Sequence, residues 1–172
     1  MILESTGTLF IGDGIQKFKK NELVLIGKNL PHMWRNDDIY FDLSSNLKAE
    51  AISIHFKKDF LGLNFFQSPE MSDISNLLER SGYGIKFSNY DPKIIEKVKK
   101  LNTLNGFEKL MELMAILNIL AKHNKYELLS SEGFLNSFNR SGNKNLDKIY
   151  SYIFKNFNKT IKLKDVAEVA NM

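Results

Sequence analysis

The stretch that decides the fold class is residues 8–18, TLFIGDGIQKF. Two short apolar runs, Thr8–Ile11 and Ile15–Phe18, flank Gly12-Asp13-Gly14, and glycine accepts the positive φ angles that tight turns need. Such runs, separated by turn residues, predict antiparallel strands. The same pattern continues outward, with further strands expected at Glu22–Ile26, Ile39–Leu43 and Lys48–Phe56. Residues 1–88 are therefore predicted to form a meander of strands, typical of a sandwich or barrel.

Helical periodicity follows the strands. Ser68-Pro69-Glu70 provides a capping serine and a first-turn proline, and the apolar stripe of Ile74, Leu77 and Leu78 comes after it. Asp91-Pro92 opens a second helix, and residues 107–121 repeat apolar side chains at helical spacing. Because only residues 102–106 separate these two segments, residues 89–124 are predicted to form an antiparallel helical hairpin.

Residues 125–144 are rich in Ser, Asn and Gly, which favours a linker. Beyond the linker, residues 145–172 resume a helical pattern. A first stripe predicts one helix (Leu146, Ile149, Ile153 and Phe157), and a second stripe predicts another (Leu163, Val166, Ala167 and Ala170).

The composition excludes several classes of function. The chain has no cysteine, so disulfides, thiolate catalysis and zinc sites that use sulfur are ruled out. Its longest apolar stretch, Leu113–Ala121, is far shorter than the roughly 20 residues that cross a bilayer. Its first residues do not resemble a secretory signal, and a cytoplasmic location is expected. The net charge of +4 fits a polyanion partner and equally an ordinary solubilising surface.

Two segments near the N-terminus, residues 7–13 (GTLFIGD) and 22–36 (ELVLIGKNLPHMWRN), resemble the cupin-like sensor domain of AraC-family transcription regulators. Further residues extend this resemblance, namely ISIHF at 52–56, Phe65-Phe66, Pro69-Glu70 and GIKF at 84–87. Residues 161–172, IKLKDVAEVANM, look like the start of the first helix-turn-helix of the same family. The two matches occur in the order that the family uses.

The resemblance implies an α+β chain with a partial cupin-like antiparallel β-barrel at 1–88, a dimerisation hairpin at 89–124, a linker at 125–144 and the start of a DNA-binding domain at 145–172. The family carries further strands before the Gly7 hairpin and recognition helices after residue 172, so we expect both to be missing here. The implied function is sensing a small effector, such as a sugar, and controlling transcription as a homodimer. DNA would be bound only through the missing part of the C-terminal domain.

His32 and Trp34 lie where cupins carry a metal-ligand histidine, so both are candidates for effector contact. The alternative is that Pro31-His32 shapes a strand and Trp34 fills the barrel core. His55 alternates with Ala51 and Ser53, so it lies either in a small-residue cavity or on the solvent side of the sheet. A metal site is not expected, because three scattered histidines without cysteine give no ligand set.

The helical stripes of the hairpin suggest a self-complementary interface between two copies, although such stripes equally form ordinary core. The predicted interface residues are Ile94, Val98, Leu101, Leu110, Met114 and Leu117. Two other functions remain open. A cupin-type isomerase or dioxygenase would need a bound metal, and a purely structural dimerisation domain would bind no effector.

Overall fold

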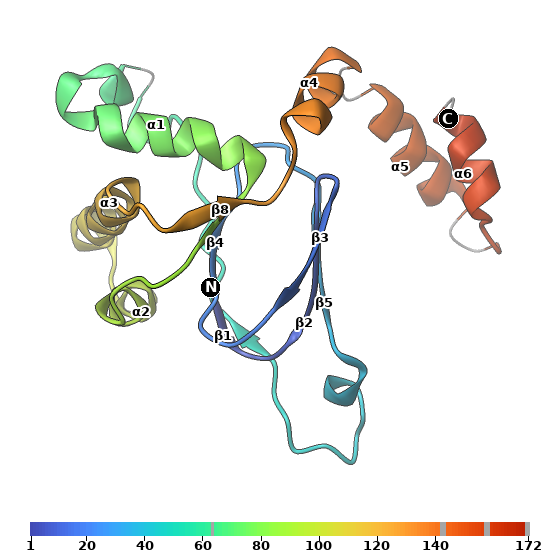
Figure 1. Ribbon diagram of the computed structural model, residues 1–172, viewed down its shortest axis with the longest axis horizontal. Helices are drawn as coiled ribbons and strands as arrows, with labels where there is room; N and C mark the ends of the chain where they lie inside the picture. The colour runs from blue at the N-terminus through green and yellow to red at the C-terminus, as the bar shows by residue number, and fades with distance from the viewer. Residues whose placement is uncertain (63, 142–143, 157–158, 171–172) are drawn as a thin grey trace. The chain divides into compact units, whose positions relative to one another are not determined.

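A computed structural model describes residues 1–62, 64–141, 144–156 and 159–170 (Figure 1). The chain divides into two compact units, Met1–Ser131 and Glu132–Met172, called unit 1 and unit 2 below. Unit 1 combines antiparallel strands with helices, and the described part of unit 2 is helical. The expected α+β class is confirmed at this level.

The hairpin predicted around Gly12-Asp13-Gly14 is present. Strands β2 (Gly7–Ile11) and β3 (Gly14–Phe18) pair antiparallel, with Ile11 opposite Gly14. Gly12 takes a φ of 55° in the turn, a conformation that glycine adopts without steric cost. The other edge of β2 pairs with β5 (His32–Asn36), a strand that the periodicity did not predict.

A second sheet has the order β4-β7-β8, from β4 (Leu23–Leu25), β7 (Ile85–Phe87) and β8 (Tyr126–Leu128). A third pairs β1 (Ile2–Glu4) with β6 (Glu50–Ala51). The amide of Ile2 donates to the carbonyl of Glu22 at 2.9 Å, which joins β1 to the residues just before β4.

The cupin-like barrel is not confirmed, because no sheet among the described residues closes on itself. The strand expected at Ile39–Leu43 is instead the 3₁₀ helix η1 (Asp38–Tyr40), followed by a turn in which Asp42 accepts hydrogen bonds from Ser44. Of the strand expected at Lys48–Phe56, only Glu50–Ala51 forms a strand, and the next residue, Ile52, exchanges backbone hydrogen bonds with Met1. Strand β1 has only three residues, so it is too short to pair with the whole of the expected strand.

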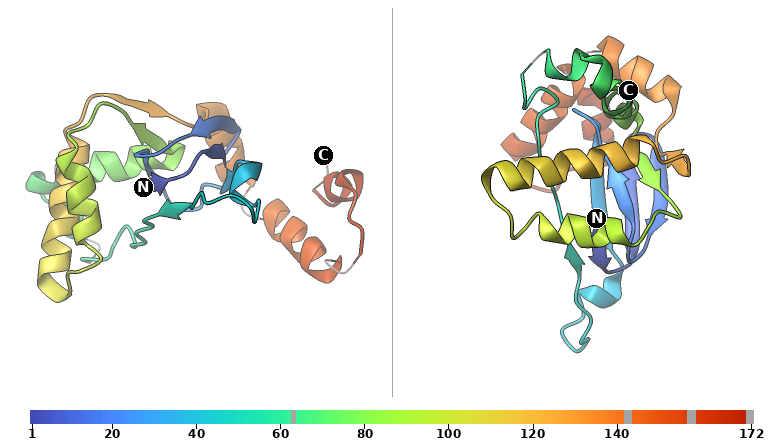
Figure 2. Two further views of the ribbon diagram at one scale, coloured as in Figure 1. Left: turned by 90° about the horizontal axis from the view of Figure 1, so that it is seen from below. Right: turned by 90° about the vertical axis from the view of Figure 1, so that its left-hand side faces the viewer.

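The predicted helices of unit 1 are confirmed as α1 (Ser72–Arg80), α2 (Lys93–Lys100) and α3 (Gly106–Ala121). Short 3₁₀ helices flank α1, namely η2 (Phe65–Gln67), η3 (Pro69–Met71) and η4 (Ser81–Tyr83). Figures 1 and 2 show α1, α2 and α3 on one side of the β4-β7-β8 sheet. Their apolar faces and that side of the sheet form the main core, whose most deeply buried members are Leu77, Ile85, Ile94, Val98 and Leu117.

Unit 2 contains α4 (Glu132–Ser141), α5 (Lys144–Asn156) and α6 (Leu163–Val169). Helices α5 and α6 pack on each other and agree with the two helices predicted in 145–172, although Phe157 lies outside the described residues. The segment expected to be a linker, 125–144, instead contains β8 and α4, and the boundary between the units falls inside it. No described helix combines the length and apolar character needed to cross a bilayer.

The core of unit 1 can be tested with two identical truncations. Leu77 is 1% exposed on α1, whereas Leu43 is fully exposed. We expect Leu77→Ala to lower the free energy of unfolding by about 2–5 kcal/mol, through lost burial and a residual cavity. Leu43→Ala should change it by less than about 0.5 kcal/mol. Urea unfolding followed by circular dichroism measures both, and equal midpoints for the two variants would contradict this description of the core.

Candidate functional site

One side of the β3-β2-β5 sheet carries the two residues at which the resemblance places effector contact. His32 and Trp34 lie on β5 opposite Ile11 and Leu9 of β2, and residues paired across an antiparallel ladder point to the same side. Ile11 and Leu9 are both buried. We call this side the inner face of the sheet.

An aromatic pair forms part of this inner face. The rings of Phe18 and Trp34 meet edge to face, with centroids 5.0 Å apart. Gly7 lies opposite Phe18 in the ladder, and a Cβ there would come within 2.6 Å of the Phe18 ring. The missing side chain at Gly7 therefore makes room for the ring that supports Trp34, which stays partly exposed.

The second sheet carries a charged group on the side away from the helices. Leu23, Ile85 and Phe87 belong to the main core, so their neighbours Val24 and Lys86 point to the opposite side. Lys86 Nζ lies 3.2 Å from Glu22 Oε2 and 3.5 Å from Glu127 Oε1. Two carboxylates thus share one ammonium, which leaves the group with a net negative charge.

Glu22 is the buried member of this group, with a side chain only 6% exposed. Burial raises the pKa of the nearby Tyr90 phenol, and the negative charge of Glu22 raises that pKa further. The Tyr90 hydroxyl donates a hydrogen bond to the carbonyl of Asn21. A buried carboxylate is tolerated here because Lys86 compensates it.

The inner face of β3-β2-β5 and the charged side of β4-β7-β8 are turned toward each other (Figure 1). The sheets meet closely at Gly84, where φ is +69° and a Cβ would lie 2.6 Å from Ile11 Cδ1. Unit 1 therefore has an aromatic surface on one sheet and hydrogen-bonding charged groups on the other. The periodicity missed Glu22 and Lys86, although charged residues inside apolar strand patterns were a visible signal.

The three histidines do not come together. The Nδ1 of His32 is hydrogen-bonded to the carbonyl of Leu30 at 2.8 Å, and the ring is otherwise exposed. His55 is exposed and makes a 2.8 Å hydrogen bond with the Ser53 hydroxyl, which agrees with the solvent-side alternative. In the part of the chain that the structure describes, no three His, Asp or Glu side chains form a metal-binding group.

Most of the residues predicted for a dimer interface are core residues. Ile94, Val98, Leu101 and Leu117 are each at most 3% exposed inside unit 1, so a second copy cannot reach them without unpacking the helices. Helical periodicity correctly grouped these residues on the apolar faces of the helices. It could not show that these faces pack inside unit 1 and not against a second copy. Leu110 and Met114 are partly exposed.

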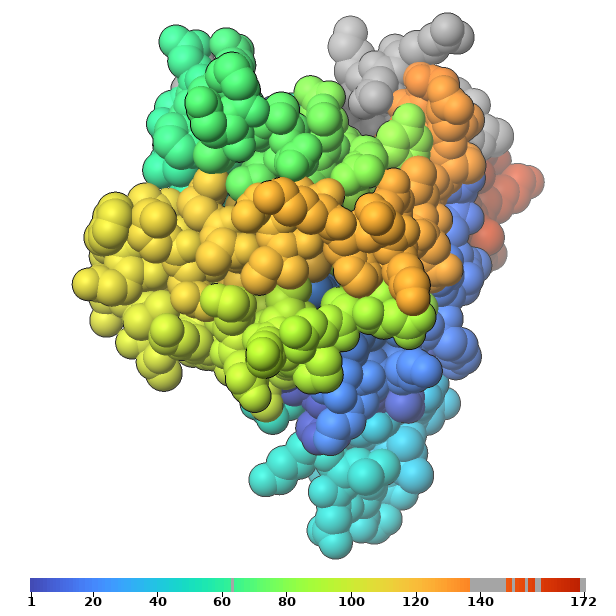
Figure 3. Space-filling model, turned by 60° about the vertical axis from the view of Figure 1, so that its left-hand side comes forward, coloured from blue at the N-terminus to red at the C-terminus, as the bar shows by residue number. Residues whose placement is uncertain are grey.

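A different apolar stripe of α3 is open to solvent. Phe107, Met111 and Ile119 are exposed, at 70%, 50% and 41%. Spacings of four and eight residues place them on one side of the helix. We call these three residues the outer stripe, and Figure 3 shows α3, in yellow and orange, crossing the surface of unit 1.

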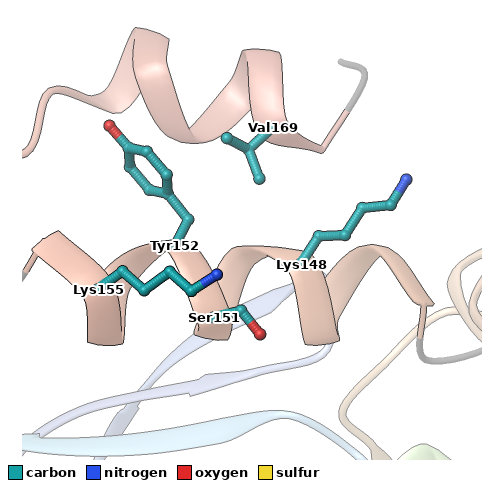
Figure 4. A pocket seen from close by; sticks show the side chains of 5 residues that line it. All are labelled: Lys148, Ser151, Tyr152, Lys155 and Val169. Atoms are coloured by element: carbon teal, nitrogen blue, oxygen red, sulfur yellow. The ribbon is translucent and has the colours of Figure 1, made fainter.

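In unit 2 a shallow hollow of about 390 Å³ lies between α5 and α6. Its walls are Lys148, Ser151, Tyr152 and Lys155 of α5 and Val169 of α6 (Figure 4). Lysine and hydroxyl side chains are common partners of phosphate groups. Residues 132–172 also hold three of the four net positive charges of the chain, a bias that the sequence already contained.

No family model, curated protein or solved structure matches the chain.

The buried charge can be tested against an exposed pair. Lys86→Met leaves Glu22 buried without its cation, and we expect a loss of about 3 kcal/mol in the free energy of unfolding. Lys17→Met breaks a surface pair, Lys17–Asp37 at 3.2 Å, and should cost less than about 1 kcal/mol. Urea denaturation compares the two. If Lys86→Met costs no more than Lys17→Met, Glu22 does not depend on Lys86 for its compensation.

Proposed function

We propose that the chain is the effector-sensing and dimerisation region of an AraC-type transcription regulator, which acts in the cytoplasm and catalyses no reaction. The observation that carries the proposal is the order of the two units. A mixed α/β unit comes first, and the segment that resembles the start of a helix-turn-helix falls on α6 of a separate helical unit. Allosteric control of DNA binding by an effector requires two distinct sites, and two separate units can provide them.

The effector contacts that we propose combine the inner face of β3-β2-β5 with the charged group on β4-β7-β8. Trp34, supported by the buried Phe18 ring, offers a partly exposed aromatic surface, and Glu127, whose side chain is half exposed, offers a carboxylate acceptor. Apolar stacking together with hydrogen-bond acceptors suits a small ring bearing hydroxyl groups, such as a sugar. His32 lies on the same strand as Trp34 and remains a candidate for effector contact. His55 is exposed and bonded to Ser53, and we do not include it among the effector contacts.

The positive charge of unit 2 fits a role in DNA binding. Lys148 and Lys155 are separated by two helical turns of α5, so both lie on the side that lines the hollow. Lysines that contact phosphates position a domain on DNA without reading its sequence. Sequence reading is assigned to recognition helices of the DNA-binding domain, of which residues 145–172 resemble only the start.

Effector binding can be measured through the only tryptophan of the chain, Trp34. We expect one class of compound in a panel of sugars and small organic acids to raise the melting temperature and to change Trp34 fluorescence. A ligand at a hundred times its Kd stabilises the protein by about 2.7 kcal/mol. If no compound in the panel does either, the effector part of the proposal fails.

Matched phenylalanine variants localise the effector. Phe18→Leu removes the ring beside Trp34 and should weaken binding about fivefold, the value of one aromatic contact. Phe41→Leu makes the same change at an exposed site and should leave binding unchanged. Equal Kd values for both variants would place the effector away from the inner face.

Dimerisation is proposed through the outer stripe, because its residues are the ones that α3 leaves exposed. We expect the unmodified chain to sediment as a dimer and Met111→Glu to sediment as a monomer with unchanged circular dichroism. The charge would lie in an apolar contact that is repeated by symmetry.

Lys109→Glu is the control for Met111→Glu. It adds a glutamate to the same helix at an exposed position about 160° away, and it should remain dimeric. A monomeric unmodified chain at about 100 µM, far above the Kd of a specific dimer, would remove the dimer from the proposal.

A further inference from the structure

The turn of the β2–β3 hairpin binds the segment through which the chain leaves unit 1. Asp13 Oδ1 accepts hydrogen bonds from the Ser131 amide at 2.9 Å and the Ser130 hydroxyl at 3.0 Å. Asp13 Oδ2 accepts one from the Ser131 hydroxyl at 2.6 Å. Ser131 is the last residue of unit 1, and unit 2 begins at Glu132. One carboxylate therefore binds the junction from a position 118 residues earlier in the chain.

The backbone brings the turn against this segment. A Cβ on Gly14 would lie 2.1 Å from the carbonyl oxygen of Leu129, so only glycine permits the approach. Leu129 and Ser130 also donate their amides to the carbonyls of Gly84 and Tyr83, at 3.0 and 2.9 Å. Ser131 is the next residue, and its amide is bonded to Asp13. We call residues 129–131 the exit segment.

These bonds suit a reversible contact. Hydrogen bonds to a charged acceptor are stronger than neutral ones, yet Asp13 lies at the surface, where water competes for the same donors. The Ser131 hydroxyl, followed by the Ser131 amide, lowers the pKa of Asp13 to about 2. The stabilisation is therefore present above about pH 3.8 and is lost as the pH falls toward 2, so the contact persists at neutral pH.

The same hairpin is connected to the inner face. Ile11, two residues before Asp13, lies opposite His32 in the β2–β5 ladder. Movement of β5 would therefore be transmitted to β2 by the backbone hydrogen bonds of this ladder, and the turn follows β2 directly in the chain. Local contacts of this kind can couple two sites when they have two discrete states, bonded and open.

We propose that Asp13 is a latch that ties the β2–β3 turn to the exit segment and thereby restricts the movement of unit 2 relative to unit 1. When the hairpin shifts, the latch opens and unit 2 gains freedom. The proposal rests on the contacts of Asp13 and on the position of the junction, so it stands apart from the proposed family and effector.

The test uses the full chain and two aspartates of similar chemistry. Asp13→Ala should make the Ser131 amide exchange with solvent about tenfold faster, measured by NMR hydrogen exchange, because that amide loses its acceptor. Amides of α1 and α3 should keep their protection. Asp42→Ala is the control, since Asp42 also accepts hydrogen bonds from a serine hydroxyl and amide, but within its own turn. It should leave Ser131 unchanged.

The movement of unit 2 relative to unit 1 is measured by a second experiment. Because the chain has no cysteine, Lys109→Cys and Lys164→Cys place one spin label in each unit. The distribution of distances between the labels should be about twice as wide with Asp13→Ala as with Asp42→Ala. Gly14→Ala, which sterically displaces Leu129, should broaden it in the same way.

Three outcomes would overturn the latch. The first is unchanged exchange of the Ser131 amide in Asp13→Ala. The second is a distance distribution that is the same in Asp13→Ala and in the unmodified chain. The third is equal loss of protection across α1 and α3, which would make Asp13 a general contributor to the stability of unit 1.

Discussion

The burial of one side of the β4-β7-β8 sheet beneath α1, α2 and α3 is the constraint on which the rest of unit 1 depends. Strands of three residues hold few backbone hydrogen bonds, and a sheet this small gains most of its stability from what packs on it. Because Ile85 and Phe87 are committed to that core, Lys86 between them must point the other way. The position of the charged group is thus a result of the hydrophobic packing on the opposite side.

Local signals predicted local structure well. The glycines around Asp13 defined the hairpin, and the apolar stripes after Pro69, Pro92 and Asn105 defined the helices, since both depend on neighbours in the sequence. The predictions that failed concerned the pairing of strands that are far apart in the sequence. The alternation in Lys48–Phe56 looked like a long strand, but only Glu50–Ala51 has a partner in β1. Alternation describes which side a residue would take, and it does not supply the neighbouring strand.

The candidate sites show the same limit. Helical spacing grouped Ile94, Val98 and Leu117 correctly, but the sequence could not show that the sheet already covers them. His32 and Trp34 were identified through the resemblance, whereas Phe18, their neighbour across β2, became relevant only with the register. Glu22 and Lys86 lie 64 residues apart and are brought together by the β4–β7 pairing alone. The residues that these contacts bring together are distant in sequence, and periodicity does not contain that information.

The pairing of β8 with β7 has a consequence for biosynthesis. Strand β8 ends at Leu128, so the β4-β7-β8 sheet cannot be completed until both α2 and α3 have been made and residue 128 has left the ribosome. Until then β7, the central strand of the finished sheet, has an open edge, which is a template for wrong pairing. Contacts over such sequence separations also slow folding, because a long loop must close before they form. The nascent chain therefore depends on helices α1 to α3, which can form locally, to shield the unfinished sheet.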